Sequence, residues 1–216
     1  MSLVSGRCVV ELFDALNDSA QEYILMRNNL NELPYQLKTG KDIDLLIRWS
    51  ERDQFFALLE KLGYRYLHHP HSDNVFLYGV KKFEFFQNPE NGIIVDVHFD
   101  LACRSLNAGE WIPLDQEIQL SAWKNRQLIQ HGEMKAWMLG NEDLFVALIV
   151  RSVFDKKEFR IEYTAEIKRL LPLIKREQVL EKLYLVFFKF APLLLQMVEV
   201  GDFDHIVTTY MTYSDY

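Results

Sequence analysis

The chain has 216 residues, of which 49% are hydrophobic, 13% aromatic and 25% charged, and this composition excludes a disordered chain and a short disulfide-stabilised scaffold. Lysine and arginine total 24 against 31 aspartate and glutamate residues, which gives a formal net charge of −7. That charge argues against broad electrostatic attachment to a long nucleic acid or to an anionic membrane. Any phosphate group therefore has to be bound locally.

Cysteine usage and the first residues bear on the compartment. Cys8 and Cys103 are too few for a disulfide framework, and neither belongs to a CxxC zinc or redox motif. The N-terminal residues contain no basic segment followed by an apolar block and a cleavage site, so we expect a cytoplasmic protein. The most apolar stretch, residues 183–198, is shorter than the roughly 20 apolar residues of a spanning helix and predicts a buried helix, with no membrane as a partner.

The first third of the chain predicts helices and strands in alternation. Apolar side chains at three- and four-residue spacing predict one or two amphipathic helices over residues 9–30. A strand is predicted over residues 42–47, followed by a helix that Ser50 caps and Gly63 ends. Residues 64–67 then form a second strand.

The texture then changes to short runs rich in aromatic and β-branched residues, which predict antiparallel strands joined by hairpins. These runs are residues 74–80, 82–86 and 93–101, with a further hairpin over residues 127–131 and 134–138. Beyond Gly140 the apolar period becomes helical, with one helix from Asn141 and two more by residue 183. We therefore predict an α+β fold, with a mixed sheet flanked by helices over residues 1–138 and a helical domain over residues 139–216.

Asp42 and Asp44 are the first candidate catalytic residues. Side chains two residues apart on a strand point to the same face, with Cα atoms about 7 Å apart, so both carboxylates can converge on one cation. The same D-x-[DE] spacing also occurs at Asp115 and Asp202, which means that spacing alone is not specific. Only the first copy combines an apolar strand with a preceding Gly-Lys turn.

A second acidic strand strengthens this prediction. Asp96, His98 and Asp100 alternate with apolar residues, so one face of the strand is apolar and the other is ionisable. A half-exposed strand explains this pattern without any site. Together with Asp42 and Asp44, however, Asp96 provides the third carboxylate that a two-metal phosphoryl-transfer site needs.

These residues resemble the nucleotidyltransferase superfamily related to DNA polymerase β, particularly its small bacterial members. The resemblance is carried by the segments KDIDLLI at residues 41–47 and VDVH at residues 95–98, and it covers most of residues 20–175. It implies a nucleotidyltransferase-like mixed sheet in which Asp42, Asp44 and Asp96 together bind two Mg²⁺ ions. The third acid then also activates the acceptor hydroxyl.

The phosphate-binding part of the family pattern differs in this chain. The family places Gly-Gly or Gly-Ser at the end of the helix before the paired acids, whereas residues 23–28 stand at that place here and offer Arg27. Lys41, in the turn before the acidic strand, is a second candidate for the nucleotide phosphates. Lys156 and Arg151 lie where relatives place a cationic residue, and each is equally explained as a solvated helix end. His98 is expected to orient Asp96 or to contact substrate.

Other chemistries find less support. The cluster of histidines over residues 68–71 is interrupted by Pro70 and predicts a polar loop. The chain contains no G-x-S-x-G, GxGxxG or GxxxxGK[ST] motif, which disfavours a hydrolase triad, a Rossmann fold and a Walker-type site.

The sequence thus predicts an enzyme that transfers a nucleoside monophosphate from a nucleoside triphosphate to an unidentified acceptor, which is a small molecule, a sugar or a protein, with release of pyrophosphate. Two alternatives stay open. One is a catalytically silent nucleotidyltransferase-fold module that binds or regulates a partner, and the other is a purely structural acidic protein. The aromatic run at residues 184–190 is able to cover a second copy of the chain as readily as a core, so a homodimer is compatible with the sequence.

Overall fold

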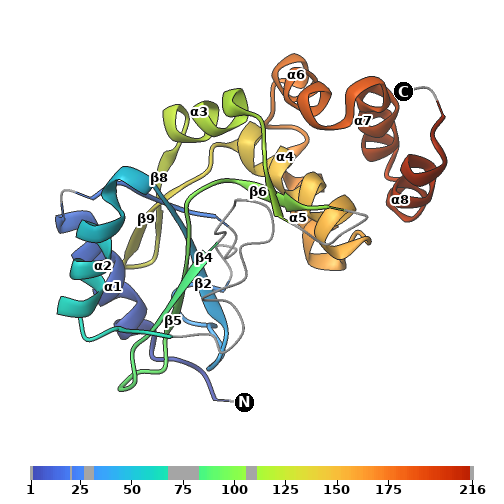
Figure 1. Cartoon of the computed structure of the whole chain (residues 1–216). Coiled ribbons are helices and arrows are strands. Elements are labelled where there is room, and N and C mark those ends of the chain that lie inside the picture. Colours follow the sequence, from blue (N-terminus) through green and yellow to red (C-terminus); the bar gives the residue numbers. More distant parts are fainter. Residues whose placement is uncertain (1, 20, 27–31, 68–82, 106–110, 215–216) are drawn as a thin grey trace. The chain divides into compact units, whose positions relative to one another are not determined.

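The computed structural model describes residues 2–19, 21–26, 32–67, 83–105 and 111–214. The chain divides into two compact units, Met1–Asp100 with Arg126–Leu139 and Leu101–Asn125 with Gly140–Tyr216 (Figure 1). The last change from one unit to the other, from Leu139 to Gly140, falls where the sequence changes to a helical period. Residues 101–125, in contrast, group with the helical unit.

A seven-stranded mixed sheet forms the first unit. Its strands are β1 (Tyr23–Leu25), β2 (Asp42–Ile47), β3 (Arg65–Tyr66), β4 (Phe83–Gln87), β5 (Ile94–His98), β8 (Gln127–His131) and β9 (Met134–Met138). They lie in the order β3-β4-β5-β2-β1-β9-β8. β2 and β5 are parallel, as are β1 and β9, and the other neighbours are antiparallel. The predicted mixed sheet is confirmed.

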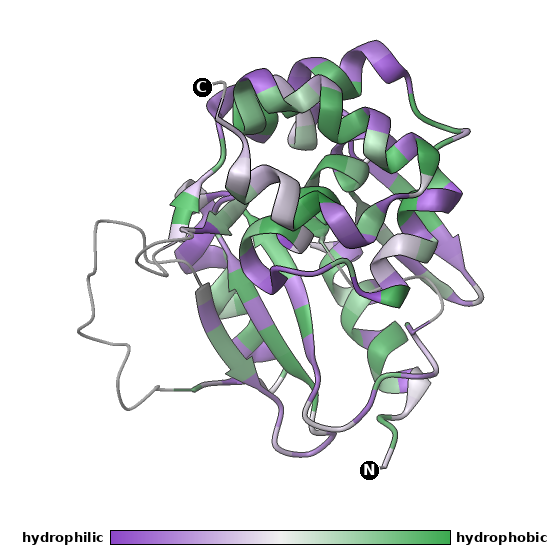
Figure 2. Cartoon of the chain, turned by 90° about the vertical axis from the view of Figure 1, so that its right-hand side faces the viewer, coloured by the Kyte–Doolittle hydropathy of each residue, from purple (hydrophilic) through white to green (hydrophobic). Residues whose placement is uncertain are grey.

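Helices α1 (Gly6–Asp18) and α2 (Arg52–Lys61) pack on one face of this sheet (Figure 1). The alternation of side chains along the strands decides which face is buried there. Ile43, Leu45 and Ile47 of β2 are fully buried in the core that the two helices share with the sheet. Figure 2 shows the same alternation as bands of hydrophobic and hydrophilic residues along the strands. The even-numbered positions of β2 therefore belong to the other face.

Several predicted elements are confirmed. The strand over residues 42–47 and the hairpin over residues 127–138 have the bounds read from the sequence. The helix predicted from Ser50 consists of a 3₁₀ turn, η1 (Trp49–Glu51), and α2. The expected cap is wrong, because Ser50 lies inside η1 and Glu51 is the N-cap residue of α2. Gly63 follows that helix with a φ of 86°, a left-handed conformation that costs glycine little.

The prediction of one or two helices over residues 9–30 is confirmed in part by α1 and is wrong for residues 23–25. Residues 23–25 form strand β1, which lies between β2 and β9. All three of its side chains are buried. Pairing with strands that are distant in the sequence decides this segment, and helical spacing of apolar residues cannot report such pairing.

Two more expectations change in the region of the aromatic runs. The strand predicted over residues 93–101 is shorter and consists of β5 alone. A further strand, β6 (Ala102–Arg104), begins beyond it and forms a separate two-stranded sheet with β7 (Trp111–Pro113). The strand predicted over residues 74–80 and the histidine cluster at residues 68–71 lie outside the described residues.

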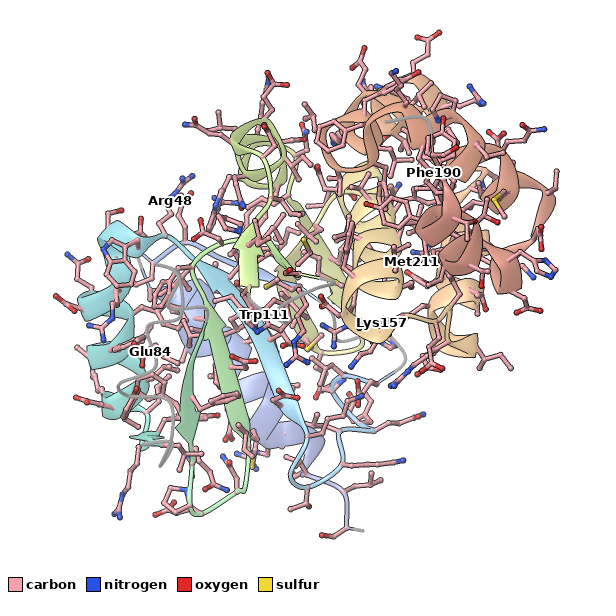
Figure 3. The ribbon with its side chains drawn as sticks, turned by 45° about the vertical axis from the view of Figure 1, so that its right-hand side comes forward. Arg48, Glu84, Trp111, Lys157, Phe190 and Met211 are labelled. Carbon is pink, nitrogen blue, oxygen red and sulfur yellow. The ribbon has the colours of Figure 1, made fainter. Side chains whose placement is uncertain are left out.

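The second unit is mainly helical. Besides β6 and β7 it contains α3 (Gln116–Lys124), α4 (Asn141–Val150), the π-helix η2 (Arg151–Lys156), α5 (Ile161–Leu170), α6 (Arg176–Phe187), the 3₁₀ turn η3 (Phe188–Phe190), α7 (Ala191–Val200) and α8 (Phe203–Thr212). Phe190 is fully buried and lies among these helices (Figure 3). The C-terminal helical prediction is confirmed.

The stretch Arg176–Val200 has the length and composition of a membrane-spanning helix, a test that core helices also pass. The single helix predicted over residues 183–198 is interrupted, because Phe188 has a φ of 48° and separates α6 from α7. Leu183, Phe187 and Leu194 within the stretch are fully buried. These side chains therefore belong to the buried core.

A buried ion pair ties α6 to α4 within the second unit. Nζ of Lys182 lies 2.6 Å from Oδ1 of Asp143, and the Asp143 side chain is 1% exposed. Oδ2 of the same carboxylate accepts a hydrogen bond from Ser121 at 3.2 Å. Both oxygens of Asp143 are thus satisfied by side chains of two other helices.

We expect Asp143→Ala to lower the free energy of unfolding by about 3 kcal/mol or more, because it leaves the Lys182 ammonium beside an apolar core without its counter-ion. Chemical denaturation of the full chain measures this loss. Glu199→Gln is the matched control, since it removes an exposed ion pair with Arg176 and should change stability by less than about 1 kcal/mol. Equal losses in the two variants would contradict the assignment.

Glu22 connects two segments of the first unit electrostatically. Its carboxylate accepts hydrogen bonds from Arg126 and, at 3.0 Å, from Nε of Arg48. These two guanidinium groups hold the pKa of the Glu22 carboxyl below its usual value. Figure 3 shows Arg48 at the end of the strand that it follows.

We expect Glu22→Gln to destabilise the protein at neutral pH and to have less effect in acid. A carboxyl whose pKa is lower in the folded state contributes stability above its unfolded pKa, about 4.3, and that contribution is lost as the pH falls through the folded pKa. Urea denaturation of both proteins at pH 7 and at several values below 4.5 measures the difference. A stability difference that does not depend on pH would contradict this role of the ionised Glu22.

Candidate functional site

The parallel strands β2 and β5 bring the two acidic segments together. In their register, Asp44 is the Cα partner of Asp96 and Leu46 is the partner of His98. Val95 and Val97, between the polar residues of β5, are fully buried in the core shared with the helices. Asp44, Asp96 and His98 therefore extend from the other face of the sheet, on two adjacent strands.

The three side chains form one compact cluster. Nε2 of His98 lies 3.2 Å from Oδ1 of Asp44 and 3.1 Å from Oδ2 of Asp96. The ligand atoms of the three residues all lie within 4.8 Å of one another. His98 is 1% exposed and Asp96 6%, so this cluster is largely removed from water.

One oxygen of the cluster is not satisfied by the residues that the structure describes. Oδ1 of Asp96 is buried and has no hydrogen-bond partner among them. A buried carboxylate oxygen without a partner costs free energy, and a bound cation supplies what is missing. Two carboxylates and an imidazole are also a donor set that divalent metals accept, so these residues fit a divalent cation.

Asp42 lies two residues before Asp44 on the same strand and on the same face, as the sequence predicts. Its Cα partner is Ile94, at the start of β5, and its carboxylate is not among the ligand atoms of the compact cluster. The structure thus brings Asp44 and Asp96 directly together and places Asp42 at the adjoining position of the strand.

The basic residues predicted to contact the nucleotide phosphates differ in their surroundings. Lys41, next to Asp42, forms an ion pair with Glu32, so part of its positive charge is already compensated. Arg27 lies outside the described residues. The prediction that it ends a helix loses its basis, because the preceding residues form β1.

Lys156 and Arg151 lie in the π-helix η2 of the second unit. Arg151 donates a hydrogen bond to the hydroxyl of Tyr163 at 2.9 Å, and its guanidinium lies 3.6 Å from the carboxylate of Asp155. π-helical turns are rare in proteins overall, and those that occur are often found at functional sites. Both candidate phosphate contacts, Lys156 and Arg151, therefore lie on one π-helical turn of the second unit.

Two residues beside the predicted site residues, Phe85 and Glu32, were not singled out from the sequence. Phe85 of β4 is the Cα partner of Asp96 and is half-buried, so its ring lies on the sheet face that carries the acids. Burial raises the pKa of the Asp100 carboxyl, which follows β5. Glu32 holds Lys41. An alternation analysis of residues 83–87 would have found Phe85 once its strand was paired with β5, but the pattern alone does not indicate that pairing.

Comparison with known proteins gives a family and a fold. The family model described as "Uncharacterised nucleotidyltransferase" matches residues 34–183, which include both acidic strands. No curated protein matches the chain.

The chain is similar to two solved structures, one of an antibiotic-resistance factor and one of an antibiotic adenylyltransferase. The solution structure of the antibiotic-resistance factor ANT(2'')-Ia has a TM-score of 0.52 and 11% identity, over 90% of this chain and 97% of that one. The lincosamide antibiotic adenylyltransferase LnuA, bound to lincomycin, has a TM-score of 0.48 and 14% identity, over 80% of this chain and 100% of that one. Since the family model matches more than half of the chain, and the mixed sheet with its C-terminal helices agrees with the fold, the chain belongs to this nucleotidyltransferase family.

Proposed function

We propose that the protein is a Mg²⁺-dependent nucleotidyltransferase that transfers a nucleoside monophosphate from a nucleoside triphosphate to an acceptor hydroxyl. The observation that supports this proposal best is the pairing of Asp44 with Asp96 across two parallel strands, where one buried carboxylate oxygen lacks a partner. Membership of the nucleotidyltransferase family supports the reaction class.

In the proposed reaction, an oxygen of the acceptor forms a new bond to the α-phosphorus. The bond from that phosphorus to the oxygen bridging to the β-phosphorus breaks, and pyrophosphate leaves with the electron pair. Divalent cations at such a site neutralise charge on the attacking and leaving oxygens. The proton of the acceptor hydroxyl passes to a carboxylate oxygen of the protein.

The position of each side chain suggests its proposed role in the reaction. Asp44 and Asp96 would hold the cation from two strands, and Asp42 would add a third carboxylate on the same face for a second ion. Asp96 is also the proposed proton acceptor, which is the role that the resemblance implies for the third acid. Lys41 is a proposed phosphate contact that has to exchange its ion pair with Glu32 for the nucleotide.

The acceptor is a hydroxyl-bearing small molecule, sugar or protein in this proposal. The net charge of −7 disfavours a long nucleic acid, whose backbone would be repelled over most of the surface. Arg27 and, in the second unit, Lys156 and Arg151 stay proposed contacts of the nucleotide phosphates.

We expect a nucleoside triphosphate and Mg²⁺ together to raise the melting temperature, and Asp44→Asn to abolish this rise. The variant removes a ligand charge but keeps the shape of the side chain, and its own melting temperature should be unchanged or raised because like charges no longer repel. A thermal-shift panel of the four ribonucleoside triphosphates, with and without Mg²⁺, provides the measurement.

Asp204→Asn is the matched control, since it removes one negative charge from an exposed position of α8. It should respond to nucleotide and Mg²⁺ like the unmodified protein. A rise that persists in Asp44→Asn would exclude the proposed role of the acids, and the absence of any rise in the unmodified protein would exclude nucleotide binding.

We expect transfer to release one pyrophosphate, and no orthophosphate, for each nucleotide incorporated. Turnover with α-labelled triphosphates and a set of small-molecule, sugar and protein acceptors measures both products. Asp96→Asn should lower the turnover by about 10²-fold or more, because it removes the general base. An α,β-methylene triphosphate should bind without turnover, since its bridging carbon cannot leave. Triphosphate binding without transfer to any acceptor would instead favour the silent binding module.

A further inference from the structure

The geometry points to His98 as a direct ligand of the cation at this site, through Nε2, and to a preference of the site for Mn²⁺ over Mg²⁺ as the consequence. This inference rests on the proposed function, because it concerns the same cation. It goes beyond it by assigning the imidazole, and not only the carboxylates, to the coordination of the metal.

The spacing of the donor atoms supports direct coordination. Nε2 of His98 lies 3.2 Å from Oδ1 of Asp44 and 3.1 Å from Oδ2 of Asp96. Two ligands at right angles around an ion with bonds of about 2.1 Å are about 3.0 Å apart. The nitrogen therefore already lies, from each of the two oxygens, at the separation that neighbouring ligands of one ion require.

The burial of His98 fixes this arrangement. The residue is 1% exposed, and its strand lies between β2 and β4, where its Cα partners are Leu46 and Phe83. By contrast, the side chain of His205 is 73% exposed on α8. A buried imidazole cannot turn into solvent when an ion enters between Asp44 and Asp96, so Nε2 remains beside the ion and coordinates it in the tautomer that carries the proton on Nδ1.

The unsatisfied oxygen of Asp96 is an independent indication of a missing positive charge. The imidazole contacts Oδ2 of this carboxylate, while Oδ1 is buried without a partner among the described residues. Since Asp96 is 6% exposed, water cannot readily satisfy that oxygen from the surface. An ion shared by the carboxylate and the imidazole compensates this charge.

The ligand types then decide which metal binds best. Mg²⁺ prefers oxygen ligands and retains its water molecules, whereas imidazole nitrogen suits transition metals. Replacing one oxygen by a nitrogen thus favours Mn²⁺ more than Mg²⁺. We expect Mn²⁺ to bind at least about tenfold more tightly than Mg²⁺, and the ratio of the two affinities to fall when the nitrogen is replaced by an oxygen.

Electron paramagnetic resonance of Mn²⁺ bound to the full chain tests the inference without using activity. The loss of the free Mn²⁺ signal on titration gives the affinity for Mn²⁺, and competition gives that for Mg²⁺. Pulsed spectra of the bound ion should show coupling to ¹⁴N, which changes to ¹⁵N coupling when the protein is labelled with ¹⁵N-histidine. His98→Asn, which offers an oxygen in place of the nitrogen, should retain a bound ion without this coupling and with a smaller preference for Mn²⁺.

His205→Asn is the matched control and should keep the coupling. His98→Asn changes a buried position, and a loss of coupling in it could therefore come from misfolding. A second variant keeps His98 and replaces the other five of the six histidines, so that its result does not depend on a change at that buried position. The coupling should persist in that variant. Bound Mn²⁺ without nitrogen coupling would overturn the inference and leave the proposed function standing. Absence of any bound ion, with or without a nucleotide, would overturn both.

Discussion

The parallel pairing of β2 with β5 is the interaction on which the candidate site depends. It sets Asp44 opposite Asp96 and lets His98 contact both carboxylates. The apolar residues between them, such as Leu45 and Val97, are fully buried under α1 and α2, which makes the strands a rigid support. Two negative charges at this distance repel each other, so the arrangement is stable only with a compensating positive group.

The family and the fold agree with this local chemistry. Nucleotidyl transfer needs little covalent participation by the protein, because most of the rate acceleration comes from positioning and from charge stabilisation at the phosphorus. Side chains fixed on two strands of a packed sheet suit this task better than side chains on loops. The proposed role of Asp96 as a proton acceptor adds one specific step to an otherwise electrostatic mechanism.

Much of this arrangement could be predicted from the sequence, because it is encoded locally. The strand over residues 42–47 follows from an alternation of acidic and apolar residues, and the same holds for residues 94–98 of β5. The strand at residues 23–25 could not be predicted, since its stability comes from β2 and β9 rather than from its own pattern.

The contact of His98 with Asp44, in addition to the expected one with Asp96, was equally hidden. It depends on the register of β2 and β5, and a shift of two residues would place Asp42, not Asp44, opposite Asp96. The nucleotide contacts are the least local part of the problem. The sequence carries no glycine-rich phosphate motif, and Lys156 and Arg151 belong to the second unit.

The donor atoms of the cluster come from strands that are far apart along the chain, since Asp44 and His98 are 54 positions apart. An ion held by both strands acts as a reversible cross-link, because the sheet can separate at this point only after the ion has left. Local opening of the sheet centre and occupancy of the site are then linked quantities. Amide hydrogen exchange in β2 and β5 would slow together as the ion concentration rises, while strands at the edges, such as β8, would open as before.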